Sequence, residues 1–510
     1  MSISIRELES QEEGLANKKN LYLLLGSLAL GLLFNFLFFE KPLGLSYPLF
    51  ITALYSFLFW NINKKPKLKL DITLLLGISI TALSLTYFFF SNPIFAVLNF
   101  FMIPILFVAH SLLLSSNNRY KWFETLFLVE LLHGISSRPL RNCLKPFSLI
   151  TKKAKSSANL SKYSVAGKVL VGLIVTIPLM IVIVPLLASA DDVFRYFLEQ
   201  IPNLFIDINT GRFIAQLLVI SIVTCLVFSY LSSLFNPKSE STDKISNLKA
   251  LSPGTFLDPI TVTTLLVLID ALYVVFIAIQ FSYLFGSLTD GLPANFTYAQ
   301  YARKGFFELV AVTLINLVIL LGNLNFVKAS GRKIDKVVKI LNTTLVVSTF
   351  IMLLSAHLRM SLYEEAYGFT YLRILTHAFM GYLFMLFSLS LAKVWRQSVP
   401  LLKSFLIVSI VAYMLMNYIN VDKIIVKNNI ERYNQGAPID IPYLTTLSYD
   451  AVPELVNFMN STTDSMLENN LENGLKYKRD FLAKDRPWQS FNISEYNAKK
   501  ILTQDLHPER

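Results

Sequence analysis

Ionisable side chains gather in one short stretch between two long apolar runs. Residues 358–377 read LRMSLYEEAYGFTYLRILTH and contain two arginines, two glutamates, a histidine and three tyrosines. Arg359, Tyr363 and Tyr367 recur every four residues, so a helix would place them on one face. Groups of these types could bind an ion or a charged small solute, or they could pair with one another.

Opposite charges in this stretch are expected to meet. We expect Arg359 and Arg373 to pair with carboxylates from Glu308, Glu364 and Glu365 in a shared pocket. An arginine stranded near the centre of a membrane costs about 2.5–3.5 kcal/mol on insertion scales, and pairing or water removes much of that cost. The competing expectation for Arg373 is that its long side chain snorkels toward the membrane surface.

Further polar clusters occur beside other apolar runs, in LLASADDVFRYF, TYAQYARKGFFEL and MNYINVDKIIVKNNIERY. If these segments lie on one side of a membrane, they predict a polar pocket open to that side. The alternative is a set of interhelical ion pairs and hydrogen bonds that only stabilise the bundle. The candidate pocket residues are Asp191, Arg303, Glu308, Arg359, Tyr363, Glu364, Glu365, Tyr367, Arg373 and His377.

One acid lies near the middle of an apolar run. Asp270, in VLIDALYVV, could bind a proton or a cation, because ionisable groups inside membranes often mark such sites. A hydrogen bond to a serine or tyrosine on a neighbouring helix is the alternative. A transporter would also need a polar path across the bilayer, for which Asp270, Asn316 and Asn342 are the candidates.

The elements that position these residues are predicted to be membrane helices. The chain is 54% hydrophobic and 16% charged, whereas a soluble domain carries about 25% charged residues. Its apolar runs approach the length of about 20 residues that crosses a bilayer. We therefore predict an all-α integral membrane protein, a polytopic helical bundle of eleven transmembrane helices. The expected spans are 21–39, 45–62, 70–90, 94–114, 167–187, 212–235, 259–285, 305–326, 338–358, 371–392 and 399–420.

The basic residues predict the orientation of these spans. With the N-terminus in the cytoplasm, 28 of the 46 lysines and arginines lie in cytoplasmic segments or at the span ends that adjoin them, 7 in the opposite loops or at their span ends, and 11 in the C-terminal tail. Such an excess of positive charge is typical of cytoplasmic loops. The stretch that contains Arg359 and Arg373 is then extracytoplasmic, as is the C-terminus.

The spans divide the chain into five expected parts. These are a cytoplasmic N-terminus at 1–20, a four-helix transmembrane segment at 21–114, a basic cytoplasmic loop at 115–166, a seven-helix transmembrane core at 167–420, and a small α-helical extracytoplasmic tail at 421–510. Within the basic loop, apolar residues of 119–135 share one helical face, which predicts an interfacial helix; a partner-binding helix is the alternative. The tail is expected to pack as a lid over the outer loops.

Several unusual strings occur together, among them YARKGFFEL, RMSLYEEAYGFTYLR and DIPYLTTLSYDAVPEL. In these strings the chain resembles a bacterial family of multi-pass membrane proteins that is catalogued only as a domain of unknown function. The resemblance covers residues from about 165 to 460. It implies a bacterial cytoplasmic (inner) membrane location and no established activity, and it supplies no catalytic or binding residues.

Several function classes are not expected. The sequence contains no phosphate-binding loop, nucleophile elbow or metalloprotease helix, so we expect no enzyme activity and no cofactor. The histidines do not pair at metal-ligand spacing within one helix, and the basic residues lie in short loops where membrane topology requires them, so we expect no metal site and no nucleic-acid partner. The lipid bilayer and an unknown small solute or protein are the expected partners. The leading hypothesis is transport or sensing of a small solute or ion at the outer-face pocket. The alternative is a membrane-embedded regulatory or scaffold protein that binds partners through its loop and tail.

Overall fold

The computed structural model describes residues 5–62, 71–116, 118–136, 184, 187, 190–191, 193–194, 196, 210–235, 256–284, 306–328 and 331–505. Across these ranges the regular elements are helices, and extended pairing is limited to an isolated bridge between Leu257 and Val327. The predicted all-α fold is therefore confirmed.

Nine helices of the described ranges are long and apolar enough to cross a membrane. They match all the expected spans but the second and the fifth. The second corresponds to helix α2 (Ser46–Asn61), which has 16 residues, and the fifth lies outside the described residues except at positions 184 and 187. The nine helical spans place the protein in a membrane, whereas the orientation of its termini stays a prediction. The nine are Lys19–Phe38, Ile72–Phe89, Pro93–Leu114, Gly211–Phe235, Pro259–Gln280, Phe306–Phe326, Arg332–Tyr367, Tyr371–Trp395 and Leu401–Tyr418.

The chain forms two compact units. The first consists of Met1–Phe88, Phe100–Glu240 and Arg486–Phe491, and the second of Phe89–Asn99, Ser241–Asp485 and Asn492–Arg510. The unit boundary therefore falls inside two helices, α3 (Ile72–Phe89) and α4 (Pro93–Leu114).

In the first unit, helices α2 and α10 (Thr210–Phe235) pack against α1 (Ile5–Phe38). The hydroxyl of Tyr55 lies 2.6 Å from Nδ1 of His110, and the hydroxyls of Ser111 and Tyr230 share a hydrogen bond. The region of the expected interfacial helix contains α5 (Thr125–Ile135), whose 11 residues are too few to cross a bilayer. Its position at the membrane interface stays a prediction.

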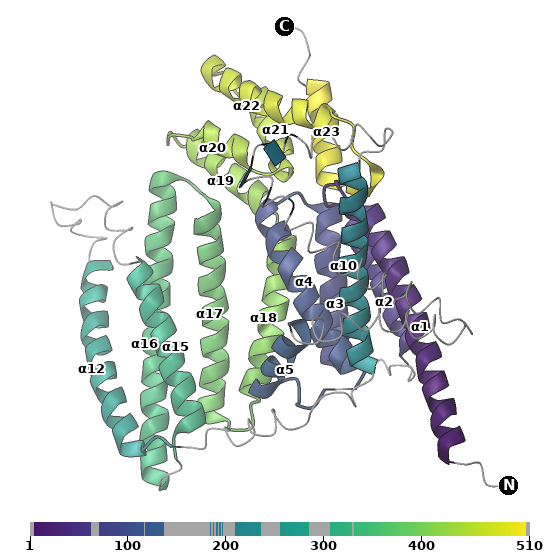
Figure 1. Cartoon of the computed structure of the whole chain (residues 1–510). Helices are drawn as coiled ribbons and strands as arrows, with labels where there is room; N and C mark the ends of the chain where they lie inside the picture. The colour runs from purple at the N-terminus through teal and green to yellow at the C-terminus, as the bar shows by residue number, and fades with distance from the viewer. Residues whose placement is uncertain are drawn as a thin grey trace, which may run out of the picture. The chain divides into compact units, whose positions relative to one another are not determined.

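In the second unit, five membrane helices run alongside one another (Figure 1). They are α12 (Pro259–Leu284), α15 (Phe306–Phe326), α16 (Arg332–Tyr367), α17 (Tyr371–Trp395) and α18 (Leu401–Tyr418). Helix α16 packs against α12, α15 and α17. Its 36 residues span roughly 54 Å at the α-helical rise, so it extends well beyond a hydrocarbon layer of about 30 Å. The last turns of α16, which carry the ionisable stretch, can therefore lie outside the hydrocarbon.

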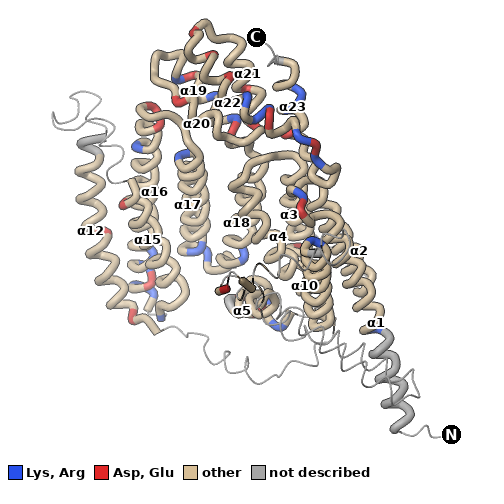
Figure 2. The backbone as a smooth tube through the Cα atoms, turned by 45° about the horizontal axis from the view of Figure 1, so that its top comes forward, with Lys and Arg blue, Asp and Glu red and all other residues tan. Residues whose placement is uncertain are grey.

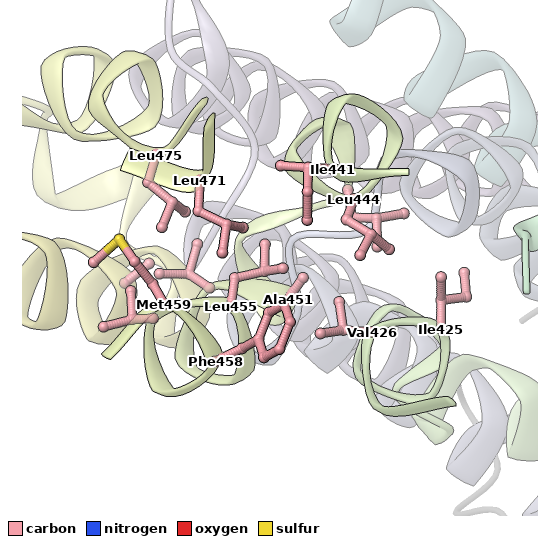
Figure 3. Packing of buried hydrophobic residues seen from close by; sticks show 14 of the residues in the cluster. Ile425, Val426, Ile441, Leu444, Ala451, Leu455, Phe458, Met459, Leu471 and Leu475 are labelled. Carbon is pink, nitrogen blue, oxygen red and sulfur yellow. The ribbon is translucent and has the colours of Figure 1, made fainter. Parts of the chain in front are cut away.

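The tail folds into short helices around an apolar core of its own. They are α19 (Val421–Asn434), α20 (Ile441–Thr446), α21 (Val452–Ser461), α22 (Ser465–Ala483) and α23 (Ile493–Asp505). Leu455, Leu471 and Leu475 are completely buried at the centre of this core (Figure 3). Pro453 occupies the first turn of α21, where its missing N–H costs nothing. Charged residues gather on these tail helices and near the ends of the membrane helices (Figure 2).

Candidate functional site

The turn between α16 and α17 is held by the side chain of Asn429 on α19. Oδ1 of Asn429 accepts the N–H of Phe369 at 3.0 Å, and its Nδ2 donates to the carbonyl of the same residue at 2.9 Å. Gly368 makes this approach possible: its φ is +84°, and a Cβ built there would lie 2.4 Å from Oδ1 of Asn429. Gly368 is therefore both the residue at which the chain turns and the point where the tail meets the turn.

Arg432, one turn further along α19, binds the end of α16. Its Nε donates to the carbonyl of Glu365 at 2.9 Å and its Nη2 to the carbonyl of Ala366 at 3.3 Å. The last carbonyls of a helix lack partners within the helix, and a cation there is also favoured by the helix dipole. Burial, together with nearby Arg373, lowers the pKa of Arg432 from its ordinary value.

Asp422, in the first turn of α19, is the centre of a second set of contacts. Only 1% of its surface is exposed. Its carboxylate accepts Nδ2 of Asn92 at 2.8 Å, the backbone N–H of Ser448 at 2.9 Å, and the hydroxyl of Tyr371. These partners come from the α3–α4 turn, the tail and the start of α17, so one carboxylate joins three separate segments.

Asp450 extends these contacts. It accepts the backbone N–H of Ser91 at 2.8 Å and the hydroxyl of Ser448 at 3.0 Å. Burial raises the pKa of Asp450 above its ordinary value, and these hydrogen bonds partly offset that effect. Close by, Lys478 donates to the carbonyl of Leu447 at 2.5 Å. We use the name tail junction for Asn92, Tyr371, Asp422, Asn429, Arg432, Ser448 and Asp450.

The predicted pairing of Arg373 with Glu308 is wrong. Glu308 is exposed on the first turn of α15, and no ion pair or hydrogen bond joins it to Arg373. The guanidinium of Arg373 instead donates to the carbonyl of Gly368 and lies over the ring of Tyr363, 4.3 Å from its centroid. The carbonyl oxygen at the helix end and the face of the aromatic ring both stabilise the positive charge of the guanidinium, so no carboxylate is required.

Three ionisable side chains form a hydrogen-bonded chain between α16 and α17. Nε2 of His377 lies 3.0 Å from Oε2 of Glu364, and Nδ1 of His377 lies 2.8 Å from Nδ1 of His357. Glu364 is buried, with 4% of its surface exposed, while His357 is exposed. We call these three residues the histidine chain.

Other predicted pocket residues take separate positions. Arg359 is buried on α16, whereas the side chains of Glu365 and Tyr367 are exposed. Asp191 belongs to the other unit, where its carboxylate accepts the N–H of Val193 at 2.8 Å. Arg303 lies outside the described residues. Of the candidate pocket residues, the structure thus brings together two pairs, Arg373 with Tyr363 and His377 with Glu364.

Asp270 lies 11 residues from the N-terminal end of α12, and only 5% of its surface is exposed. Neither carboxylate oxygen has a hydrogen-bond partner among the described residues. The alternative prediction of a hydrogen bond to a neighbouring serine or tyrosine is therefore not met within the described part of the chain.

Polar side chains follow the contacts of α16 with α12 and α15 along much of the helix length. The hydroxyl of Tyr273 donates to Oδ1 of Asn316 at 2.6 Å, and Nδ2 of Asn316 donates to Oγ1 of Thr349 at 2.9 Å. Two further pairs are Asn323 with Asn342 at 3.0 Å and Gln280 with Ser355 at 2.5 Å. These seven side chains and Asp270 form what we call the polar ladder. It includes all three residues of the predicted polar path.

The part of the chain that the structure describes contains no group of three or more histidine, cysteine, aspartate or glutamate residues arranged to hold a metal ion.

Several residues of the tail junction carried no prediction. Asn92, Tyr371 and Asp450 were not singled out, although Asp422, Asn429 and Arg432 were recognised as part of a polar segment. The signal for Asn92 is weak but present, since SNP interrupts two apolar runs at positions 91–93. Asp450 lies in DIPYLTTLSYDAVPEL, one of the strings that carry the family resemblance.

A family model described as a domain of unknown function, DUF4153, matches residues 77–458. The chain belongs to this family. The match begins inside α3, so it includes α4 and part of the N-terminal segment, which the resemblance seen in the sequence did not reach. No curated protein and no solved structure matches the chain. Membership in DUF4153 agrees with the multi-pass membrane fold and assigns no activity.

Proposed function

We propose that this DUF4153 protein moves a small ion, a proton or a metal cation, across the membrane through the helices of its second unit. Asp270 would be the residue that binds the ion. The observation that carries the proposal is the burial of a carboxylate without a hydrogen-bond partner among the described residues, on an apolar helix long enough to span a bilayer.

The energetic reason is the cost of such an acid. An aspartate at the centre of a membrane helix costs about 2.5–3.5 kcal/mol on insertion scales. A structural aspartate would offset that cost by accepting hydrogen bonds, as Asp422 does. A bound proton or cation offsets it equally well, and an acid that takes up and releases an ion must keep its oxygens available.

The polar ladder supports the same proposal. A residue that binds an ion in the bilayer needs polar groups on both sides of it, through which the ion can be passed. Asn323 and Asn342 lie toward one end of α16, and Gln280 and Ser355 toward the other, with Asn316 and Thr349 between them. The lysine and arginine pattern predicts that the end near Ser355 is the extracytoplasmic one.

A sensing role has one observation in its favour. The tail binds the last turn of α16 through Arg432 and the following turn through Asn429, and α16 is also the helix that carries most of the ladder contacts. A ligand of the tail would then act on the ion path. A pure scaffold would need neither the ladder nor a buried acid.

The test is ion flux into liposomes that contain the purified protein. Flux of protons, Na⁺ and K⁺ would be followed with ion-sensitive dyes for the wild type and for Asp270→Asn. We expect one of these ions to move, and Asp270→Asn to slow it at least about tenfold, a factor equivalent to 1.4 kcal/mol.

The matched control is Asp258→Asn. Asp258 is the other aspartate of this helix region, is exposed, and accepts the N–H of Ile260 at 2.9 Å at the start of α12. Asparagine can make the same helix-capping contact, so this variant should conduct as the wild type does. Equal flux in Asp270→Asn and the wild type would overturn the proposal, and so would a wild type that moves none of the three ions.

A further inference from the structure

We propose that the histidine chain is a proton-binding relay at the end of the bundle that carries the tail, and that the ion moved by the protein is the proton. The second half of this proposal rests on the proposed function, whereas the first half is a property of Glu364, His377 and His357 alone. The three residues connect an exposed imidazole to a buried carboxylate.

The geometry fixes which nitrogens carry hydrogen. An ionised carboxylate only accepts hydrogen bonds, so Nε2 of His377 donates to Oε2 of Glu364 across 3.0 Å. A neutral imidazole has one donor and one acceptor nitrogen, so Nδ1 of His377 is the acceptor. Nδ1 of His357, which is 2.8 Å away, must then be the donor. Every proton in the chain is directed from His357 toward Glu364.

Protons can pass along this chain without any change in heavy-atom bonding. A proton from water binds Nε2 of His357 and makes its ring an imidazolium. The proton on Nδ1 of His357 passes to Nδ1 of His377, and the proton on Nε2 of His377 passes to Oε2 of Glu364. One proton has entered and one carboxylate has become neutral; both imidazoles end neutral, and no electrons are transferred.

Glu364 has the features of a proton acceptor at the inner end of the chain. It is buried, and its second oxygen, Oε1, has no hydrogen-bond partner among the described residues. A carboxylic acid has one oxygen that donates and one that accepts, so neutral Glu364 leaves Oε1 or Oε2 able to pass a proton further on. A glutamate that served only to orient His377 would not need to be buried with a free oxygen.

A metal ion fits this geometry less well than a proton does. Two nitrogens that bind one zinc ion at 2.0–2.1 Å in tetrahedral geometry lie about 3.3 Å apart, which is longer than the 2.8 Å between the two Nδ1 atoms. The third member, Glu364, contacts the far nitrogen of His377 and does not face the space between the rings.

The charges around the chain disfavour more than one extra proton on the two histidines. Arg373 lies one turn from His377 on α17, and Arg432 of α19 is electrostatically coupled to Arg373. Arg359 is buried on α16, next but one to His357. The acids on α16 and on the helices packed against α16 and α17 are Glu364 itself, the exposed Glu365 and Glu308, and Asp270, Asp335, Asp422 and Glu431. Of these acids, Glu364 is the one that is hydrogen-bonded to a histidine of the chain. The nearby arginines therefore disfavour a second extra proton on the two rings.

Histidine side-chain NMR tests the relay without any transport assay. The chain has five histidines, so ¹⁵N-labelled imidazole signals can be assigned with His357→Asn and His377→Asn. At pH 8 we expect the nitrogen chemical shifts to show a proton on Nδ1 of His357 and on Nε2 of His377, which is the pair of tautomers that the relay requires. In each single variant the remaining ring should no longer be held in this one tautomer by its histidine partner.

Flux measurements in liposomes then test the role of the relay in transport. Glu364→Gln and His377→Asn should each slow proton uptake at least about tenfold. The matched control is Glu365→Gln, which changes the neighbouring exposed glutamate and should leave uptake unchanged. If Asp270→Asn stops flux while Glu364→Gln and His377→Asn do not slow it, or if the ion that moves is Na⁺ or K⁺ with no proton, the relay proposal is overturned and the proposed function stands.

The NMR result also distinguishes the relay from the proposed function in the case that no ion flux is seen. The expected pair of tautomers in a protein that moves no ion would overturn the proposed function and the choice of the proton as the ion it moves, and would leave a proton-binding site. The same tautomer in both rings, ring signals that the partner's substitution does not change, or binding of Zn²⁺ by both rings at pH 7 would overturn the relay.

Discussion

Two buried aspartates of the second unit have opposite surroundings. Asp422 is 1% exposed and accepts hydrogen bonds from Asn92, Tyr371 and Ser448. Asp270 is 5% exposed and accepts none from the described residues. Burial alone therefore does not distinguish a structural acid from one that binds an ion; the donors around it do.

The same contrast separates the two ends of the ionisable stretch. The backbone N–H and carbonyl of Phe369 are both hydrogen-bonded to the side chain of Asn429, which leaves the turn few alternatives. Glu364 and His377 lie one helical turn or more from Gly368 and share a hydrogen bond. In the proposed relay, the proton of this bond moves from the imidazole to the carboxylate. The tail junction should thus respond to mutation with loss of stability, and the ladder and histidine chain with loss of function.

The largest effect is expected for Asp422→Ala. The substitution leaves Asn92, Tyr371 and Ser448 with buried donors that lack a partner, and hydrogen bonds to a charged group contribute about 1.5–3 kcal/mol each. We expect a loss of at least about 3 kcal/mol in the free energy of unfolding of the tail in detergent. Limited proteolysis of the tail and thermal unfolding would measure it.

Asp480→Ala is the control for this prediction. Asp480 is an exposed aspartate on α22 whose ion pair is with the adjacent Arg479. Exposed pairs of this kind contribute about 0–1 kcal/mol. Equal sensitivity of the two variants to protease would show that the contacts of Asp422 do not hold the tail.

Gly368→Ala should have the next largest effect. A side chain at φ +84° is strained, and the new Cβ would lie 2.4 Å from Oδ1 of Asn429 and 2.9 Å from Nη1 of Arg432. Strain in such backbone conformations costs about 1–3 kcal/mol, before any displacement of the two tail side chains. Gly381→Ala on α17 is the control, since nothing lies within 4 Å of its Cβ position. A loss of stability that is the same in both variants would contradict the proposed contact.

The contribution of Asp450 to the pH dependence of tail stability should be a smaller effect than that of Gly368→Ala, and its sign can be predicted. Burial raises its pKa in the folded protein above the ordinary 3.8. The protonated form is thus favoured by folding, so this stabilising contribution is complete below pH 3.8 and is lost as the pH rises through the folded value. Tail unfolding followed between pH 4 and pH 7 should depend less on pH in Asp450→Asn than in the wild type. An identical pH dependence would contradict the prediction.

Much of the fold could be predicted from the sequence, because a membrane imposes a strong pattern. Nine of the expected spans match helices, since runs of about 20 apolar residues have few other solutions. Helix α16 is longer than expected, because Arg332–Lys336 and Arg359–Tyr367 continue the helix outside the apolar run. Hydropathy identifies the part of a helix that crosses the hydrocarbon layer. It does not identify the polar turns by which the same helix continues into water.

The candidate site was harder to predict, for a different reason. The lysine and arginine pattern placed positions 91–93, 359–373 and the tail on one side, and the structure brings these three segments into contact at Asp422. The sequence does not show which groups each charged side chain contacts. Arg373 contacts the carbonyl of Gly368 and the ring of Tyr363. A backbone carbonyl is present in every residue, so this acceptor could not be recognised from the residue types.

Asp270→Asn should have almost no effect on stability. The side chain makes no hydrogen bond with the described residues, so asparagine removes the cost of a charge in the bilayer and loses little. We expect a change within about 0.5 kcal/mol, or a small gain, in thermal unfolding in detergent. A loss comparable with that of Asp422→Ala would show that Asp270 has a structural partner, and the contrast between the two aspartates would disappear.

The smallest effect is expected for a double-mutant cycle of Glu308 and Arg373. Glu308 is exposed on α15, and Arg373 contacts Gly368 and Tyr363, so the two side chains have no shared partner. The unfolding free energies of Glu308→Gln and Arg373→Gln should therefore add in the double variant to within about 0.3–0.5 kcal/mol, as they do for independent sites. Arg373→Gln alone should be the more harmful change, because it removes a charged donor from the carbonyl of Gly368 and a cation from the ring of Tyr363. A coupling energy well above that limit would mean that the carboxylate reaches the arginine in the membrane. The charge of Arg373 would then be neutralised by an acid of the bundle, and the helix end would not be what holds it.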